Sequence, residues 1–140
     1  MIRSDEILVG EVMYPVSHAL RAGMVLPEAV DLILDSGFTG LPVLDDKERV
    51  IGFLSEHDCI PFLLNGSYHC DNRTLVRDIM YNEPLTVTIH DNIIDLAQNM
   101  RDAKPKVYPV LDDGELVGVI TRHHVMRALS DAFHACKIVA

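Results

Sequence analysis

The chain has 140 residues, of which 49% are hydrophobic, so it is long enough to bury one compact core and too short for two large domains. Its formal net charge is −9 at pH 7, and nucleic-acid binding needs a basic surface that neutralises phosphates, so DNA and RNA are not expected partners. The first six residues carry acids where a secretory signal would be basic and then apolar, and no apolar run reaches the roughly 20 residues that span a bilayer. We therefore expect a soluble, cytoplasmic protein with no membrane partner.

The same unit occurs twice along the chain. Residues 40–46 (GLPVLDD) return as residues 107–113 (VYPVLDD), an offset of 67. Residues 50–58 (VIGFLSEHD) match residues 116–124 (LVGVITRHH) at an offset of 66, so the turn between the two strings is one residue shorter in the second copy. An internal repeat of this length makes each copy half of one structure. The two expected repeats are residues 1–66 and residues 67–140.

Each copy is expected to begin with a short strand and an amphipathic helix. The strands lie near residues 18–21 and 84–88. Pro27 fits the first turn of a helix, because the N–H that proline lacks has no partner there. Apolar residues follow at the spacing of one helical face in both copies, which predicts two helices that pack inward. These residues are Val30, Ile33, Leu34 and Gly37 in the first copy and Ile93, Leu96, Ala97 and Met100 in the second.

A hairpin follows the helix in each copy. The short apolar runs 41–44 and 108–111 end at paired aspartates, which open turns. Residues 50–54 and 116–120 are rich in branched side chains and are predicted to be the returning strands.

A second helix is expected to close each copy directly after a hydroxyl residue. Ser55 and Thr121 occupy this N-cap position, where a side-chain oxygen can accept from the free amides of the first turn. The predicted order is therefore β-α-β-β-α in both copies. The polar stretch 65–73 is rich in turn-forming residues and is expected to link them.

The doubled order of motifs resembles the cystathionine-β-synthase (CBS) domain. The likeness rests on LPVLD at residues 41–45, YPVLD at residues 108–112 and the Gly-x-x-Ser/Thr strings that follow them, and it covers residues 9–64 and 76–129. Two tandem copies are similar to the pair called a Bateman module. The resemblance implies an α/β (α+β) fold in which two β-α-β-β-α CBS repeats pack about a pseudo-twofold axis. It further implies a regulatory module, not an enzyme, that senses AMP, ADP, ATP or S-adenosylmethionine in the cleft between repeats and requires no cofactor.

The first copy carries the complete family string, Gly52, Ser55 and Asp58. The resemblance places the ribose of the ligand on the aspartate, and a carboxylate can accept from two neighbouring ribose hydroxyls. The helix start would offer free amides and a partial positive charge to phosphate. The string is equally close to a capping box, in which the hydroxyl and the carboxylate satisfy amides of the first turn. Within the doubled framework we favour ribose binding for Asp58 and allow both roles for Ser55.

The resemblance implies that the other repeat completes this site. In similar modules the aspartate of one copy works with the leading strand and the pre-Pro-Val segment of the other. Lys106 is either a contact to phosphate or to the adenine edge, or a solvated lysine at a strand end. By matched position, the remaining site residues are Thr39 and Gly40 from the same copy and Thr88, Ile89, Lys106, Val107 and Tyr108 from the second.

The second copy departs from the family pattern. Thr121 keeps the hydroxyl, but His124 stands where the ribose-binding aspartate belongs. A neutral imidazole offers one acceptor where a carboxylate offers several, so this second site is expected to be degenerate. Arg122 is either a phosphate contact or surface charge, and we favour surface charge. The opposite wall of this site would come from Arg21, Ala22, Thr39 and Gly40.

The sequence leaves three functional hypotheses open: an adenosine sensor, a ligand-free scaffold and a metal-dependent enzyme. Three cysteines without CxxC spacing indicate reduced thiols, and the seven histidines form no HxxxH pair on a helical face. No nucleophile elbow or GxxxxGK string occurs, so no catalytic or metal residues are predicted. The alternative to an adenosine sensor is a ligand-free dimeric scaffold that docks on a separate enzyme or transporter, and a metal-dependent enzyme ranks last. Residues 32–34 (Leu-Ile-Leu) make a helix apolar on more than one face, which predicts a homodimer.

Overall fold

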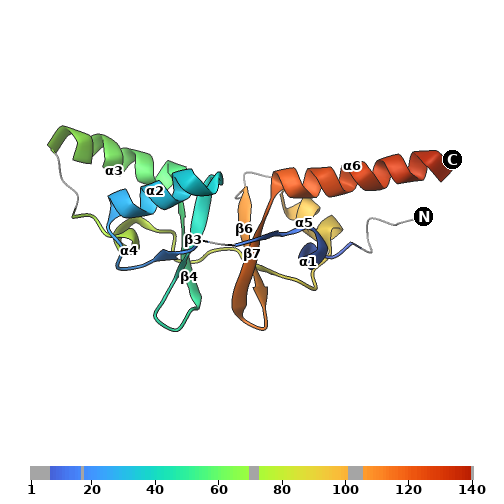
Figure 1. Cartoon of the computed structure of the whole chain (residues 1–140), viewed down its shortest axis with the longest axis horizontal. Helices are drawn as coiled ribbons and strands as arrows, with labels where there is room; N and C mark the ends of the chain where they lie inside the picture. Colours follow the sequence, from blue (N-terminus) through green and yellow to red (C-terminus); the bar gives the residue numbers. More distant parts are fainter. Residues whose placement is uncertain (1–6, 17, 70–72, 101–105, 140) are drawn as a thin grey trace. The chain divides into compact units, whose positions relative to one another are not determined.

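The computed structural model describes residues 7–16, 18–69, 73–100 and 106–139 (Figure 1). The chain divides into two compact units, which we name the contiguous unit (residues 17–84) and the split unit (residues 1–16 with 85–140). Each unit has one small sheet with helices, which confirms the predicted mixed α+β class. Among the described residues, no helix is long and apolar enough to cross a membrane.

The contiguous unit is built on a three-stranded sheet in the order β2-β3-β4. β2 pairs with β3 in parallel and β3 pairs with β4 antiparallel, as a leading strand and a hairpin should. Pro27 lies in the first turn of α2, and α3 begins directly after Ser55, so the predicted order of the first copy is confirmed. The elements are β2 (Leu20–Arg21), α2 (Leu26–Ser36), β3 (Gly40–Leu44), β4 (Val50–Ser55), α3 (Glu56–His69) and α4 (Val76–Ile79).

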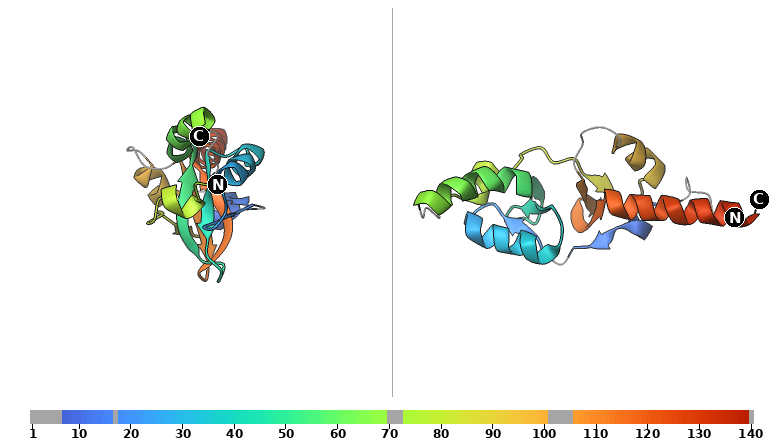
Figure 2. Two further views of the ribbon diagram at one scale, coloured as in Figure 1. Left: turned by 90° about the vertical axis from the view of Figure 1, so that its left-hand side faces the viewer. Right: turned by 90° about the horizontal axis from the view of Figure 1, so that it is seen from above.

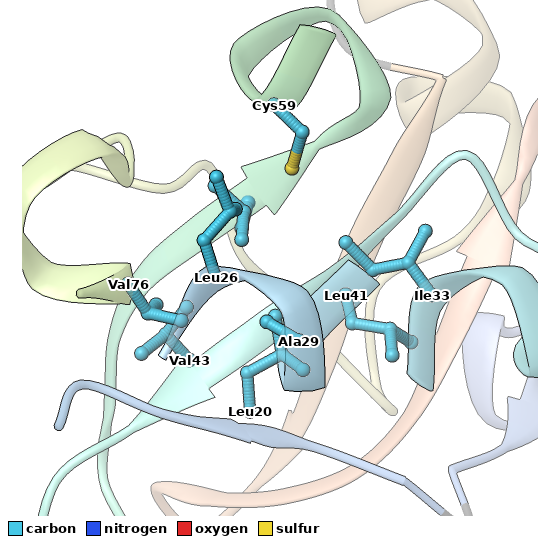
Figure 3. Packing of buried hydrophobic residues seen from close by; sticks show 9 residues of the cluster. Leu20, Leu26, Ala29, Ile33, Leu41, Val43, Cys59 and Val76 are labelled. Carbon is cyan, nitrogen blue, oxygen red and sulfur yellow. The ribbon is translucent and has the colours of Figure 1, made fainter. Parts of the chain in front are cut away.

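The core of the contiguous unit lies where α2 covers the sheet (Figure 3). Burying a leucine, isoleucine or valine side chain contributes about 1.5–3 kcal/mol. The prediction that Leu34 belongs to this core is wrong, since its side chain is 66% exposed. The buried face of α2 runs through positions 26, 29 and 33, and position 34 lies outside it. The buried members of the core include Leu20, Leu26, Ala29, Ile33, Leu41 and Val43.

The helix α3 is longer than the sequence indicated. It runs from Glu56 to His69, so residues 65–69 of the expected linker are helical. Compared with alanine, Gly66 destabilises a helix by about 1 kcal/mol and Ser67 by less. Neither cost is enough to end a helix that has already formed several turns. The remaining part of the expected linker includes residues 70–72, which lie outside the described residues.

The split unit carries a four-stranded sheet in the order β1-β7-β6-β5. β5 pairs with β6 in parallel and β6 with β7 antiparallel, which repeats the pattern of the contiguous unit. The helix α6, drawn in orange-red, continues directly from β7 (Figure 2). Ile93, Leu96 and Met100 are buried as predicted. The elements are α1 (Val9–Val12), β1 (Tyr14–Pro15), β5 (Val87–Thr88), α5 (Ile93–Asn99), β6 (Val107–Asp112), β7 (Glu115–Thr121) and α6 (Arg122–Val139).

The second hairpin is one residue shorter than the first, as the change in offset from 67 to 66 predicted. Asp112 pairs with Glu115, and the two residues between them, Asp113 and Gly114, have φ angles of 52° and 83°. Two positive φ angles in a two-residue loop are typical of a type I′ turn, which matches the twist of the strands. The first hairpin is one residue longer and has a positive φ at Glu48.

Each sheet receives the segment that precedes the other repeat in the sequence. In the split unit, Tyr14 pairs with Val119 and Pro15 with Gly118. In the contiguous unit, Tyr81 forms the equivalent bridge with Phe53. We name residues 9–15 and 76–81 the crossing segments. The leading segments are therefore exchanged: by sequence Tyr14 belongs to the first repeat, and it completes the sheet of the second.

Glycine makes this close approach possible in both units. A Cβ atom added at Gly118 would lie 2.7 Å from the carbonyl oxygen of Tyr14. A Cβ atom added at Gly52 would lie 2.5 Å from Sδ of Met80. Real Cβ atoms do not come so near to other atoms, so the glycine of each Gly-x-x-Ser/Thr string admits a crossing segment.

Candidate ligand-binding site

Ser55 and Asp58 form a complete capping box at the start of α3. The N–H of Asp58 donates to Ser55 Oγ at 3.2 Å. In return, the N–H and the hydroxyl of Ser55 donate to Asp58 Oδ2 at 3.2 Å and 2.9 Å. The hydroxyl hydrogen of Ser55 is therefore already used, and Ser55 positions Asp58 instead of donating to a phosphate. Oδ1 of Asp58 has no hydrogen-bond partner among the described residues, and it can accept from a ligand.

Thr39 and Gly40 lie next to this cap. The carbonyl of Thr39 accepts from the N–H of Glu56 at 2.8 Å, and Gly40 pairs with Ser55 across the hairpin. A Cβ atom at Gly40 would lie 2.6 Å from the carbonyl oxygen of Leu54, so only glycine fits. The contiguous unit thus brings four of the predicted site residues to one end of its sheet. They are Thr39, Gly40, Ser55 and Asp58.

The equivalent end of the split unit gathers a second group of predicted residues. The carbonyl of Lys106 accepts from the N–H of Arg122 at 3.1 Å, and Val107 pairs with Thr121. These residues and His124 therefore lie at the junction between the sheet and α6. The side chains of Lys106 and Arg122 are exposed, which fits either of the two roles considered for each.

Tyr108 stands apart from this group because its side chain points into the core. The residue is 3% exposed and packs with Val9, Leu96 and Val125. Its hydroxyl has no hydrogen-bond partner among the described residues. Burial raises the pKa of the Tyr108 phenol, although the positive charge of Arg122 acts against this. The phenol is therefore neutral near pH 7, and it remains a buried donor available to a further partner.

The structure separates Thr88 and Ile89 from the other predicted residues of the split unit. Thr88 pairs with Leu111, four residues along β6 from Val107, which corresponds to about 13 Å. The N–H of Ile89 donates to the carbonyl of Leu111, and its side chain lies against Gly10. The two residues thus lie at the opposite end of the sheet from α6.

Arg21 and Ala22 of the contiguous unit have the position that Thr88 and Ile89 have in the split unit. Arg21 pairs with Leu44, beside the hairpin turn, and its guanidinium donates to the carbonyl of Asp45 at 2.8 Å and to Glu48 Oε1 at 2.6 Å. The carbonyl of Ala22 accepts from the N–H of Arg77 at 2.9 Å. Neither residue lies at the sheet end that holds Thr39 and Gly40.

The direction of β2 and β5 identifies further candidate site residues that were not predicted from the sequence. β2 and β3 are parallel, as are β5 and β6, so the residues before β2 and β5 lie toward the capped ends of the sheets. These residues are His18 and Ala19 in one unit and Leu85 and Thr86 in the other. Leu85 and Thr86 are both exposed. The signal was present in the sequence, since matched strands in a β-α-β order are parallel.

Thr121 and His124 form the second cap, at the start of α6, in which His124 takes the place that Asp58 has in the first cap. The N–H of Thr121 donates to Nδ1 of His124 at 3.2 Å, and the N–H of His124 donates to Thr121 Oγ1 at 3.2 Å. The imidazole ring stacks on Tyr14, with centroids 5.8 Å apart and planes 7° from parallel. The single acceptor of the neutral ring is thus used by the cap, so His124 keeps no acceptor for a ribose hydroxyl.

The buried thiol of Cys59 is poorly suited to act as a nucleophile. Burial, followed by the charges of Asp58 and Glu56, raises the pKa of the Cys59 thiol to about 11. The thiol is therefore protonated and a poor nucleophile near pH 7. No group of three or more His, Cys, Asp or Glu side chains in the described part of the chain could hold a metal ion.

Two repeats of one α+β unit, each with a capped helix at a sheet end, define a tandem-repeat module. The model of the CBS domain family matches residues 9–65 and 76–131, and the chain belongs to this family. It is 30% identical to the CBS domain-containing protein CBSX1, chloroplastic, of Arabidopsis thaliana over 90% of this chain and 65% of that protein. It is 28% identical to CBSX2, chloroplastic, of the same plant over 86% of this chain and 62% of that protein. The chain thus spans slightly less than two thirds of these relatives.

A solved structure of CBSX2 in complex with AMP has the same fold. The match has a TM-score of 0.76 at 30% identity and covers 89% of this chain and 97% of that chain. A CBS domain-containing protein of unknown function from Bacillus anthracis matches with a TM-score of 0.80 at 19% identity, which supports the fold alone. The predicted family and the predicted fold are therefore both confirmed.

Proposed function

We propose that the chain is a regulatory module that binds an adenosine-containing ligand through Asp58. The observation that carries this proposal is the geometry of the first cap, in which Oδ2 of Asp58 is used and Oδ1 is available. One carboxylate oxygen has two lone pairs, so it can accept from both neighbouring hydroxyls of a ribose. The AMP complex of CBSX2, a protein 30% identical to this chain, supports an adenine nucleotide as the ligand.

The ribose end of the proposed site consists of Thr39, Gly40, Ser55 and Asp58. Ser55 acts as a positioning residue, because its hydroxyl holds the carboxylate of Asp58. The contributions of Lys106, Val107 and Tyr108, which the family resemblance implies, stay predictions. Thr88 and Ile89 also stay predictions, although their place at the far end of β6 argues against a shared role with Lys106. The proposed role is sensing and includes no catalysis.

The number of bound nucleotides tests this proposal. We expect titration calorimetry with AMP, ADP, ATP, S-adenosylmethionine and NAD to give about one site per chain for the wild type, because only the first cap offers a free carboxylate oxygen. In His124→Asp, a carboxylate would rebuild the second cap as in Ser55 and Asp58, and the stoichiometry should rise toward two.

His123→Asp is the matched control for this experiment. It places the same charge one residue earlier on α6, outside the capping position, and it should leave the stoichiometry at one. Two sites in the wild type, or an unchanged value in His124→Asp, would contradict the assignment. An absence of binding by every compound in the panel would favour the ligand-free scaffold.

We also propose that the chain forms a homodimer. This assembly is expected whether the chain is an adenosine sensor or a ligand-free scaffold that docks on a separate effector. Large apolar side chains on α2, α3 and α6 are between 53% and 70% exposed, and a second copy that covered them would remove this apolar surface from water. They are Leu34, Ile60, Leu64, Met126 and Phe133.

Light scattering checks the assembly. At tens of micromolar, the wild type should have twice the 15.6 kDa mass of the chain. The double variant Ile60→Glu, Met126→Glu places a charge at matched positions of α3 and α6 and should be monomeric, whereas Ser130→Glu, a charge at an exposed polar position of α6, should remain dimeric. A monomeric wild type would overturn the homodimer.

A further inference from the structure

The two helix caps of this protein use different acceptors, a carboxylate oxygen in the contiguous unit and an imidazole nitrogen in the split unit. Nδ1 of His124 can accept from the N–H of Thr121 only while it keeps its lone pair. A protonated imidazole carries a hydrogen on both nitrogens, so its Nδ1–H would face the N–H of Thr121. The first cap uses carboxylate Oδ2 of Asp58 for the same purpose and contains no imidazole.

The same imidazole contacts the crossing segment of the split unit. Its ring lies parallel to that of Tyr14, which is one of the two residues that pair β1 with β7. A ring that turned to relieve the contact with Thr121 would lose this stacked arrangement. One side chain therefore links the start of α6 to the edge strand β1. The matched residue of the contiguous unit, Asp58, has no ring that could stack in this way.

The charges around His124 favour its neutral form. Arg122, His123 and Arg127 lie on α6 itself, and Arg127 contacts Nε2 of His123 at 3.2 Å. The ring of Tyr14 on β1 stacks on that of His124, and Lys106, directly before β6, adds a positive charge. The acids on the other helices packed against α6 are Glu11 of α1 and Asp95 of α5, and both are exposed.

These surroundings set the direction of the pH effect. Burial, followed by the charges of His123 and Arg127, lowers the pKa of His124 below its ordinary value of about 6.5. As the pH falls below about 6.5, an opened or unfolded chain takes up the proton before the folded unit does. The contacts of His124 therefore lose stability as the pH decreases across this interval, and they are intact above it.

We propose that His124 makes the split unit a pH-responsive element: its protonation releases the cap of α6 and the hold on the crossing segment at residues 9–15, while the contiguous unit is unaffected. Loss of an N-cap contact of this kind corresponds to about a fivefold increase in the population of the opened state. The response is local, because the cap and the stacked pair both belong to the split unit.

Hydrogen exchange between pH 7.5 and 4.5, corrected for the intrinsic pH dependence of exchange, tests this proposal. The peptides that cover residues 9–16 and 118–125 should exchange about fivefold faster at the acid end, whereas those that cover residues 51–59 and 78–83 should not change. Nuclear magnetic resonance should show the ring of His124 and the amide of Thr121 titrating with one common midpoint below 6.5. Equal acceleration in both pairs of peptides would overturn the proposal, because it would show a general loosening in acid.

Two variants identify the responsible group. His124→Asn keeps an acceptor at the capping position that does not titrate, and it should abolish the acid response. His123→Asn leaves the cap intact and removes one neighbouring charge, so the response should persist with its midpoint moved upward. If the asparagine variant does not fold, His124→Asp serves in its place. A response that persists after either replacement of His124 would refute the assignment.

Discussion

Replacing Asp58 with alanine should remove most of the thermal stabilisation that an adenosine nucleotide gives this protein. At a free concentration of about one hundred times Kd, a ligand that binds only the folded state contributes about 2.7 kcal/mol. For a chain of this size the melting temperature should rise by about 5–10 °C. Charge-assisted hydrogen bonds from two hydroxyls to Oδ1 contribute about 1.5–3 kcal/mol, so Asp58→Ala should lower the affinity by about one to two decades.

Asp78→Ala is the matched control, because Asp58→Ala also removes a helix cap. Oδ2 of Asp78 accepts from the N–H of Leu75 at 3.1 Å, so this aspartate has the same capping role at the start of α4, away from the proposed site. Both variants should melt lower without ligand, by an amount that reflects about 1 kcal/mol for the lost cap. Differential scanning fluorimetry should show the full nucleotide shift in Asp78→Ala only. A full shift in Asp58→Ala would remove the basis of the proposed site.

The second large effect is expected at the glycine that admits a crossing segment. In Gly118→Ala the new Cβ would lie 2.7 Å from the carbonyl oxygen of Tyr14 and 2.9 Å from Sδ of Met13. The sulfur of a flexible methionine can move, but the backbone carbonyl of a paired strand cannot move without loss of its register. Overpacking of this kind typically costs about 1–3 kcal/mol, and we expect a loss of stability in that range.

Urea denaturation should reveal this loss as a lower midpoint with an unchanged slope. Gly23→Ala is the control, since a Cβ atom there meets nothing within 4 Å. It should be neutral or slightly stabilising, because alanine restricts the unfolded chain more than glycine does. Equal midpoints for the two alanine variants would show that the close approach at Gly118 has no energetic consequence.

Local patterns in the sequence predicted where the second helix of each copy begins and how the two hairpins differ. Gly-x-x-Ser/Thr strings predicted where α3 and α6 begin, and the missing residue predicted the tighter second hairpin. The end of α3 was not predictable in this way, since polar residues such as Asn65 and Gly66 weaken a helix without stopping it. The capping role of His124 was missed, because the pattern indicated a lost carboxylate and did not show that an imidazole can replace one in a cap.

The candidate site was only partly predictable for a geometric reason. The spacing of the Gly-x-x-Ser/Thr string singled out Ser55 and Asp58, and the family resemblance added Thr39 and Gly40. The four residues lie together because they are close in the hairpin and in the turn that follows it. Thr88 was assigned by its offset from the first copy, and the direction of β5 against β6 places it at the opposite end of the sheet. The exchange of crossing segments could not be predicted either, since Tyr14 and Tyr81 have equivalent sequence surroundings and nothing local states which sheet each one joins.

The exchange also determines the order in which the units can be completed during synthesis. The contiguous unit needs only residues 17–84, so it can form as soon as they have emerged from the ribosome. Tyr14 must wait for Val119, its partner 105 residues later, and closing so long a loop has an entropic cost. Until β7 is made, the apolar crossing segment has no sheet to join. Residues 9–15 therefore fold after the contiguous unit that follows them in the sequence, and they stay open to capture by chaperones until β7 is made.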